Sequence, residues 1–143
     1  MRKWLKILVL ISRFGLAAMW LFAAGAKLYT LEEFTFNLTN LVRESLASPL
    51  AISVIAAEIL AAVLLLVPRT ARLGAALTAL MLVGFALYGL YYVYVMHGEP
   101  LECGCFGGII GSQLGVKTAL RNLLLLVPAA LVFFGTARLR RLE

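Results

Sequence analysis

The hydrophobic pattern of the chain consists of four long apolar runs separated by shorter polar segments. The runs cover residues 5–28, 50–67, 73–96 and 118–136, and they lack the alternation of a barrel strand. At about 1.5 Å per residue, each run is long enough, or nearly so, to cross about 30 Å of hydrocarbon as a helix. Because backbone groups in lipid must bond within their own segment, the pattern predicts an all-α membrane protein built as a four-transmembrane-helix bundle.

Local features refine the ends of these runs. The second run stops at Pro68, and Pro128 inside the fourth run is expected to kink it. The first run has a basic start, as a signal peptide does, but Arg13 interrupts it and it is long for a signal core, so we expect a retained helix. No segment is long enough to separate a second domain, so residues 1–143 are expected to form a single integral membrane domain.

The segment between the first two runs has a helical period of its own. Its apolar positions are Leu31, Phe34, Leu38, Leu41, Val42 and Leu46. Thr30 followed by Glu33 fits a capping box, and Pro49 follows the last apolar position. The segment therefore predicts an amphipathic helix over residues 30–48, lying on the outer membrane surface between spans one and two.

Composition agrees with a bilayer as the solvent. Hydrophobic residues make up 63% of the chain and charged residues only 14%, whereas a soluble domain carries about 25% charged residues. The net charge of +6 comes from basic residues at the ends of apolar runs, without a basic patch interleaved with aromatic residues. We therefore expect the lipid bilayer as a partner and no binding of nucleic acid.

The distribution of charge predicts the orientation. One side collects eight basic residues: Arg2, Lys3, Lys6, Arg69, Arg72, Arg138, Arg140 and Arg141. The other side has fewer basic residues, and these are mixed with glutamates. By the positive-inside rule both termini are predicted to be cytoplasmic, and residues 97–117 are predicted to face the periplasm or the cell exterior, where disulfides persist.

That outer segment holds the only two cysteines, in the sequence Cys103-Gly104-Cys105-Phe106-Gly107. The spacing alone leaves three chemistries open: a redox-active disulfide, a soft-metal site, or a pair of inert thiols. A disulfide across Gly104 would close a small strained ring, which favours a labile redox bond over a structural staple. A metal site would need further ligands, for which His97, Glu99 and Glu102 are the candidates.

Charged side chains near the cysteines and inside the spans are the other candidates. Lys117 and Arg121 follow the cysteine segment, where they either stabilise a thiolate or snorkel at the interface. Arg13 and Glu58 lie at depths of about 12 Å and 13 Å from the cytoplasmic side, so we predict that they face each other. This pair serves either as a packing ion pair or as a site for protons or a quinone headgroup. Lys27 is the third predicted intramembrane polar residue.

Several of these residues carry a family resemblance. They are Arg13, Gly25-Ala26-Lys27-Leu28, Phe34, Glu58, Cys103-Gly104-Cys105-Phe106-Gly107 and Arg121-Asn122. With them the chain resembles the MauE family of methylamine-utilisation membrane proteins, within the wider DoxX-like group. The resemblance implies a multi-pass protein of a bacterial or archaeal inner membrane, linked to periplasmic thiol–disulfide chemistry. It also implies a thioredoxin-like partner and a role in the maturation of a disulfide-rich dehydrogenase subunit.

The resulting hypothesis is a membrane thiol–disulfide oxidoreductase with Cys103 and Cys105 as its catalytic pair. Gly104, Phe106, Gly107, Lys117, Arg121 and Asn122 are its predicted supporting residues. A periplasmic thioredoxin-like protein is the expected partner, a quinone is a candidate cofactor, and no resident metal is assigned. The alternatives are a non-enzymatic membrane scaffold for maturation of a secreted redox protein, and a protein that handles soft metal ions.

Overall fold

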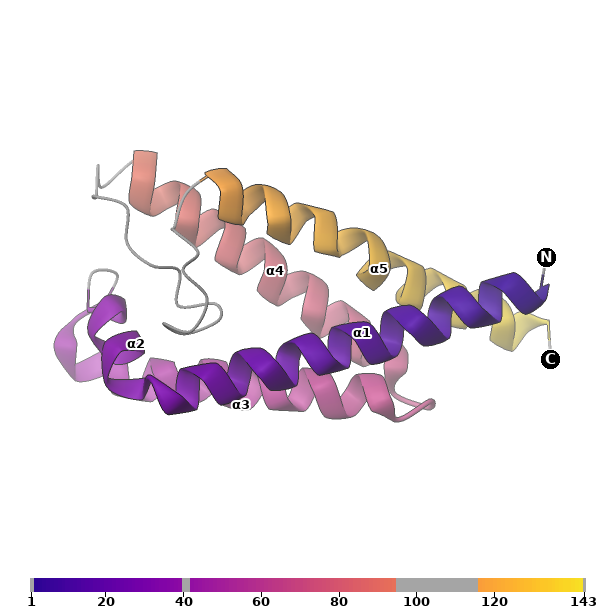
Figure 1. Ribbon diagram of the computed structural model, residues 1–143, viewed down its shortest axis with the longest axis horizontal. Coiled ribbons are helices and arrows are strands. Elements are labelled where there is room, and N and C mark those ends of the chain that lie inside the picture. Colours follow the sequence, from indigo (N-terminus) through magenta and orange to yellow (C-terminus); the bar gives the residue numbers. More distant parts are fainter. Residues whose placement is uncertain (1, 40–41, 95–115, 143) are drawn as a thin grey trace.

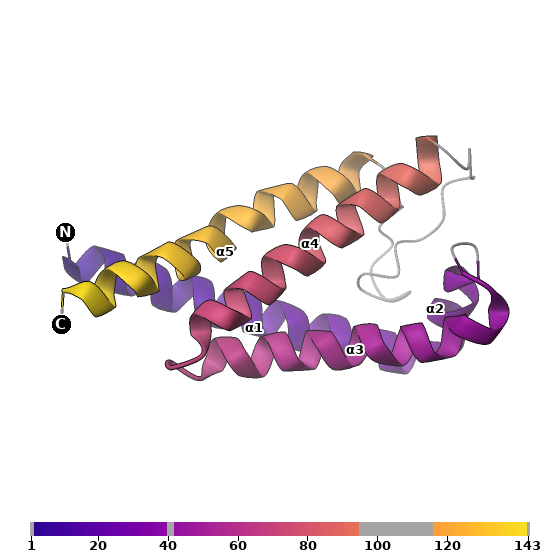
Figure 2. The same ribbon diagram turned by 180° about the vertical axis from the view of Figure 1, so that it is seen from behind.

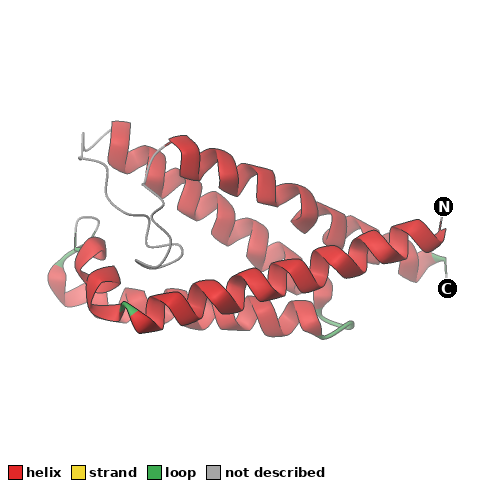
Figure 3. Cartoon of the chain, viewed as in Figure 1, coloured by secondary structure: helices red, strands yellow, loops and turns green. Residues whose placement is uncertain are grey.

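The computed structural model describes residues 2–39, 42–94 and 116–142, and these residues form five helices. The helices are α1 (Arg2–Tyr29), α2 (Leu31–Leu38), α3 (Glu44–Leu66), α4 (Ala71–Tyr94) and α5 (Val116–Arg141). The described residues contain no strand, and short turns connect the helices within each described stretch (Figure 3). All the helices except α2 are long and apolar enough to cross a membrane, which confirms the predicted all-α bundle of four spans.

The four long helices form a ring in which each packs against two others. α1 contacts α3 and α5, and α4 contacts the same two helices. α1 and α3 run antiparallel as one pair, α4 and α5 form the other, and the two pairs diverge towards the end that carries α2 (Figure 2). Both termini lie at the opposite end, where α1 and α5 extend beyond the turn between α3 and α4 (Figure 1).

Three of the four long helices, α1, α3 and α5, are longer than the apolar runs that predicted them. α1 begins at Arg2 and α5 continues to Arg141, since the charges that end an apolar run do not end a helix. α3 begins at Glu44, ahead of the predicted start at residue 50, with Pro49 and Pro128 lying inside α3 and α5. Each proline lacks the N–H that would bond the carbonyl four residues earlier, so each removes one backbone hydrogen bond from its helix.

The helix between the first two spans is present but shorter than predicted. α2 ends at Leu38, and the rest of the predicted amphipathic segment belongs to the connection and to the first turns of α3. Phe34 and Leu38 of α2 are buried against Ala47 and Ala51 of α3. The predicted capping box is wrong, because Thr30 makes no side-chain cap to α2 and its hydroxyl donates to Ala26 O at 3.0 Å.

Small residues allow the helices to pack closely. Alanines make up much of the buried core, as expected where lipid competes with the apolar side chains and close backbone approach drives association. Gly74 at the start of α4 is the tightest such position towards backbone atoms. A Cβ added there would lie 2.7 Å from Leu65 N and 2.9 Å from the Leu64 carbonyl carbon, so only glycine lets α4 begin against the end of α3.

We therefore expect Gly74→Ala to destabilise the bundle by about 1–3 kcal/mol, because the added methyl group collides with backbone that has no room to move. The matched control is Gly84→Ala on the same helix, where an added Cβ meets nothing within 4 Å. Thermal unfolding of the two purified variants in detergent measures the difference. Equal melting temperatures for the two variants would contradict the close contact at Gly74.

Candidate functional site

A buried ion pair joins α1 to α3. Lys27 lies in the last turn of α1 and Glu58 lies in the middle of α3, and both side chains are fully buried. Lys27 Nζ donates to Glu58 Oε1 at 2.5 Å. Since a charged group inside a membrane-spanning segment is costly without an opposite charge, this contact fixes how the two helices face each other.

Two aromatic rings complete the surroundings of the ammonium group. Lys27 Nζ lies 5.5 Å from the ring centre of Phe34 on α2 and 5.5 Å from that of Phe85 on α4. Both distances allow a cation–π interaction. Lys27, Glu58, Phe34 and Phe85 are named the Lys27 site below; it draws side chains from four of the five helices.

A second buried polar contact adjoins the Lys27 site. Trp20 Nε1 donates to Thr78 Oγ1 at 3.0 Å, and the Trp20 ring lies 6.3 Å from the ring of Phe85. These contacts tie α1 directly to α4 across the ring of helices. The hydrogen bond to Thr78 therefore holds in place the Trp20 ring, which packs against Phe85 of the Lys27 site.

One polar atom of the Lys27 site is unsatisfied. Glu58 Oε2 is buried and has no hydrogen-bond partner among the described residues. A carboxylate oxygen in this state can accept a hydrogen bond or a proton from a group that enters the site. Across residues 2–39, 42–94 and 116–142, three or more histidine, cysteine or acidic side chains do not come together as metal ligands.

The predicted contact between Arg13 and Glu58 is wrong. Arg13 donates from Nε to Leu65 O and from Nη2 to Leu66 O, both at 2.9 Å. These carbonyls belong to the last turn of α3, where they lack partners within the helix and carry its negative dipole end. The depth estimate failed because it set the ends of the two helices level, whereas the N-terminal part of α1 extends past the end of α3 (Figure 1).

The predicted cysteine pair and its neighbours Gly104, Phe106 and Gly107 lie outside the described residues. Lys117 is described by its backbone alone, in the first turn of α5. Arg121 is half-buried, and Asn122 is buried with no hydrogen-bond partner for Nδ2 in the described part of the chain. α4 ends at Tyr94 and α5 begins at Val116, both at the end of the bundle that carries α2 (Figure 1).

Sequence reasoning named Lys27 and Glu58 but missed that they bind each other. The sequence does contain a signal for this pairing. Glu58 is the sole charged residue in the apolar run 50–67, so it needs a cation from another helix. Lys27 lies near the end of the first run, directly after an alanine-rich segment, and was a candidate equal to Arg13. Phe85 gave no signal, because one aromatic residue in an apolar span is ordinary.

A comparison with known protein families gives one match. Residues 5–135 match the family described as methylamine utilisation protein MauE. The chain belongs to the MauE family. No curated protein and no solved structure shows significant similarity to the chain. The matched range of this MauE-family protein contains the Lys27 site as well as Cys103-Gly104-Cys105.

Family membership and the four apolar helices together make this MauE-family chain a multi-pass membrane protein. Both termini lie at one end of the bundle, as an even number of spans requires (Figure 1). The assignment of that end to the cytoplasm stays a prediction from the distribution of basic residues.

A double-mutant cycle tests whether Lys27 and Glu58 stabilise each other. Lys27→Met and Glu58→Met are each expected to destabilise the protein by about 3 kcal/mol or more, because each leaves one charge buried and unpaired. The double variant should cost clearly less than the sum of the two, since it leaves no lone charge. Denaturant unfolding in mixed micelles measures all three variants.

Glu33→Gln is the control for this cycle, because Glu33 is an exposed carboxylate on α2. It should leave the free energy of unfolding within about 0.5 kcal/mol of the parent. If the effects of Lys27→Met and Glu58→Met simply add, the two side chains do not stabilise each other and the pair has no role in packing.

Proposed function

We propose that this MauE-family protein is a membrane thiol–disulfide oxidoreductase in which Cys103 and Cys105 exchange electrons with a periplasmic thioredoxin-fold protein. The observation that carries the proposal is the family match, whose range of residues 5–135 includes the only two cysteines of the chain. Their separation by one glycine suits a small, strained and readily exchanged disulfide.

The exchange proceeds through a mixed disulfide. A thiolate of one protein attacks the disulfide of the other, one S–S bond breaks and an intermolecular S–S bond forms. The second thiolate of the attacking protein then attacks the first sulfur of the same protein, which breaks the intermolecular S–S bond and releases the partner's thiolate. One dithiol is thereby oxidised and one disulfide is reduced. Two electrons and two protons are transferred from the dithiol to the disulfide, and the same steps run in either direction.

A complete cycle needs a second redox partner. The chain holds one cysteine pair, so no second pair of its own can accept the electrons on the other side of the membrane. A quinone in the bilayer is the first candidate, and a second thiol protein is the other. Either one returns the pair to its starting oxidation state by accepting or supplying two electrons and two protons.

The arrangement of the bundle supports an outward-facing pair. α4 ends and α5 begins at the end opposite the termini, and the basic residues that the positive-inside rule assigns to the cytoplasm flank the termini and the α3–α4 turn. In this proposal Lys117, Arg121 and Asn122 at the start of α5 supply cationic and hydrogen-bonding groups near a thiolate. The Lys27 site gives that half of the bundle a fixed, buried anchor.

Single replacements of the two cysteines test the exchange. Cys103→Ser and Cys105→Ser each remove one thiol, so one of them should accumulate a mixed disulfide that cannot resolve. The measurement is a reductant-sensitive band on non-reducing gels, with the linked protein identified by mass spectrometry. The double Cys→Ser variant is the control and should form no such band.

Two outcomes would contradict the redox assignment. If neither single variant traps a partner while both retain their folded yield, the cysteines do not exchange disulfides. If the double Cys→Ser variant still supports maturation of the exported redox protein, the chain acts as a non-enzymatic scaffold.

Metal analysis separates the remaining alternative. The redox proposal predicts that reduced protein, purified without chelators, retains well under one zinc or copper ion per chain. For zinc, the reason is that two thiolates alone do not complete the tetrahedral set that holds the ion tightly. For copper, the reason is that the proposed exchange uses both sulfurs and leaves none bound to a resident ion. One equivalent of metal, lost in the double Cys→Ser variant, would favour soft-metal handling instead.

A further inference from the structure

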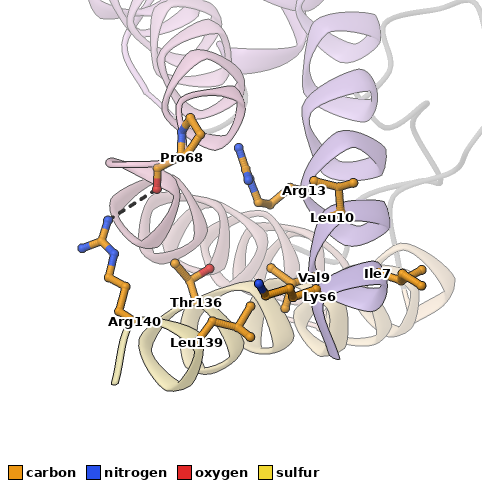
Figure 4. A pocket seen from close by; sticks show the side chains of 9 residues that line it. All are labelled: Lys6, Ile7, Val9, Leu10, Arg13, Pro68, Thr136, Leu139 and Arg140. Atoms are coloured by element: carbon orange, nitrogen blue, oxygen red, sulfur yellow. Dashed lines mark hydrogen bonds between the residues drawn. The ribbon is translucent and has the colours of Figure 1, made fainter. Parts of the chain in front are cut away.

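A cationic pocket lies at the end of the bundle that carries both termini. It has a volume of about 450 Å³ and lies between the first turns of α1, the last turns of α5 and Pro68 in the α3–α4 turn (Figure 4). Its basic side chains are Lys6, Arg13 and Arg140. The pocket is far from the Lys27 site and takes no part in the function proposed above.

The pocket is a consequence of unequal helix lengths. α1 and α5 extend past the α3–α4 turn, so their projecting ends have no third helix between them (Figure 1). At Gly135 the two helices come so close that an added Cβ would lie 2.5 Å from Val9 Cγ2. Val9 also lines the pocket, so this close contact between α1 and α5 adjoins it.

Two of the basic groups are held in place by backbone carbonyls. Arg13 donates to Leu65 O and Leu66 O, and Arg140 donates to Arg69 O at 2.7 Å and to Pro68 O at 3.4 Å. Carbonyl groups orient a guanidinium without neutralising its charge, and each guanidinium has further N–H donors to offer. The described residues that line the pocket include three basic side chains and no acidic one, an arrangement that attracts anions.

A buried hydroxyl adds a directional group. Thr136 Oγ1 lines the pocket, is buried, and has no hydrogen-bond partner among the described residues. A lone buried hydroxyl is costly, and a ligand oxygen would satisfy it. Fixed cations together with such a hydroxyl match the oxygens of a phosphate group, which accept several charge-assisted hydrogen bonds.

The apolar lining indicates where the phosphate comes from. Ile7 and Leu10 line the pocket and are about half exposed on the outer surface of α1, followed by the exposed Ile11 and Phe14. These side chains continue from the pocket along the face of a membrane-spanning helix, where acyl chains lie. A phosphate with attached acyl chains therefore fits better than a free phosphate ion.

We propose that this pocket binds the phosphodiester headgroup of an anionic phospholipid from the leaflet at the terminal end of the bundle. Lys6, Arg13 and Arg140 contact the headgroup charge, and Thr136 donates to a phosphate oxygen. Bound there, the lipid joins α1, α5 and the α3–α4 turn, which are otherwise held at this end by the two arginines. Zwitterionic lipid is disfavoured because its own cation faces three positive groups.

Native mass spectrometry of the purified full chain in detergent tests the site, with dioctanoyl phosphatidylglycerol as the probe. Lys6→Gln is expected to weaken binding about fivefold, as one lost cation near a lipid surface implies. Lys3→Gln is the matched control, since Lys3 is an exposed lysine of the same helix outside the pocket, and it should change binding less than twofold. Thr136→Val should weaken binding without changing the charge.

Each remaining outcome decides against the proposal. Equal losses in Lys6→Gln and Lys3→Gln would reduce it to diffuse attraction of anions to a basic surface. Equal binding of dioctanoyl phosphatidylcholine would remove the role of lipid charge. Displacement of the lipid by millimolar inorganic phosphate, with similar affinity for both, would assign the pocket to the free anion.

Discussion

The absence of water inside a bilayer is the constraint on which this structure depends. Lys27 and Glu58 are fully buried in membrane-spanning helices, where neither charge is tolerable without the other. Their contact fixes the relative position of α1 and α3. The same ammonium group also meets Phe34 and Phe85, so one charge specifies how α2 and α4 approach the first pair of helices. A purely apolar interface could slide by a turn at little cost, whereas this one cannot.

The position that this pair imposes explains both ends of the bundle. Lys27 is near the end of α1 while Glu58 is in the middle of α3, so α3 begins well beyond the end of α1, and α2 covers that extra length through Phe34 and Leu38. At the other end α1 projects past α3 by the same stagger. The exposed carbonyls of the α3 terminus and the following turn are then met by Arg13 and Arg140, and the cationic pocket opens between the projecting helices.

The sequence was sufficient to predict which segments lie in the membrane. It was insufficient to predict how far neighbouring helices are shifted along each other. Apolar runs identified all four spans, because hydropathy is read residue by residue. The Arg13–Glu58 contact was wrong because hydropathy cannot show that two neighbouring helices are staggered. The predicted capping box was wrong for a local reason, since the Thr30 hydroxyl donates to Ala26 O in the preceding turn. The motif residues Lys27, Phe34 and Glu58 were recognised singly, and only the fold brings them together.

The polar groups of the bundle also bear on how electrons and protons could leave the proposed cysteine pair. Arg13 is bound to the end of α3, and Lys27 is bound to Glu58. Between them the described core is mainly alanine and leucine, and it contains the hydrogen bond from Trp20 to Thr78. A proton relay needs closely spaced groups that can exchange hydrogen bonds, whereas the described residues of this cluster are largely apolar. In the proposed function, exchange at the face that carries the cysteines needs no path through this core, and the second redox partner reaches the pair from the membrane plane or from outside.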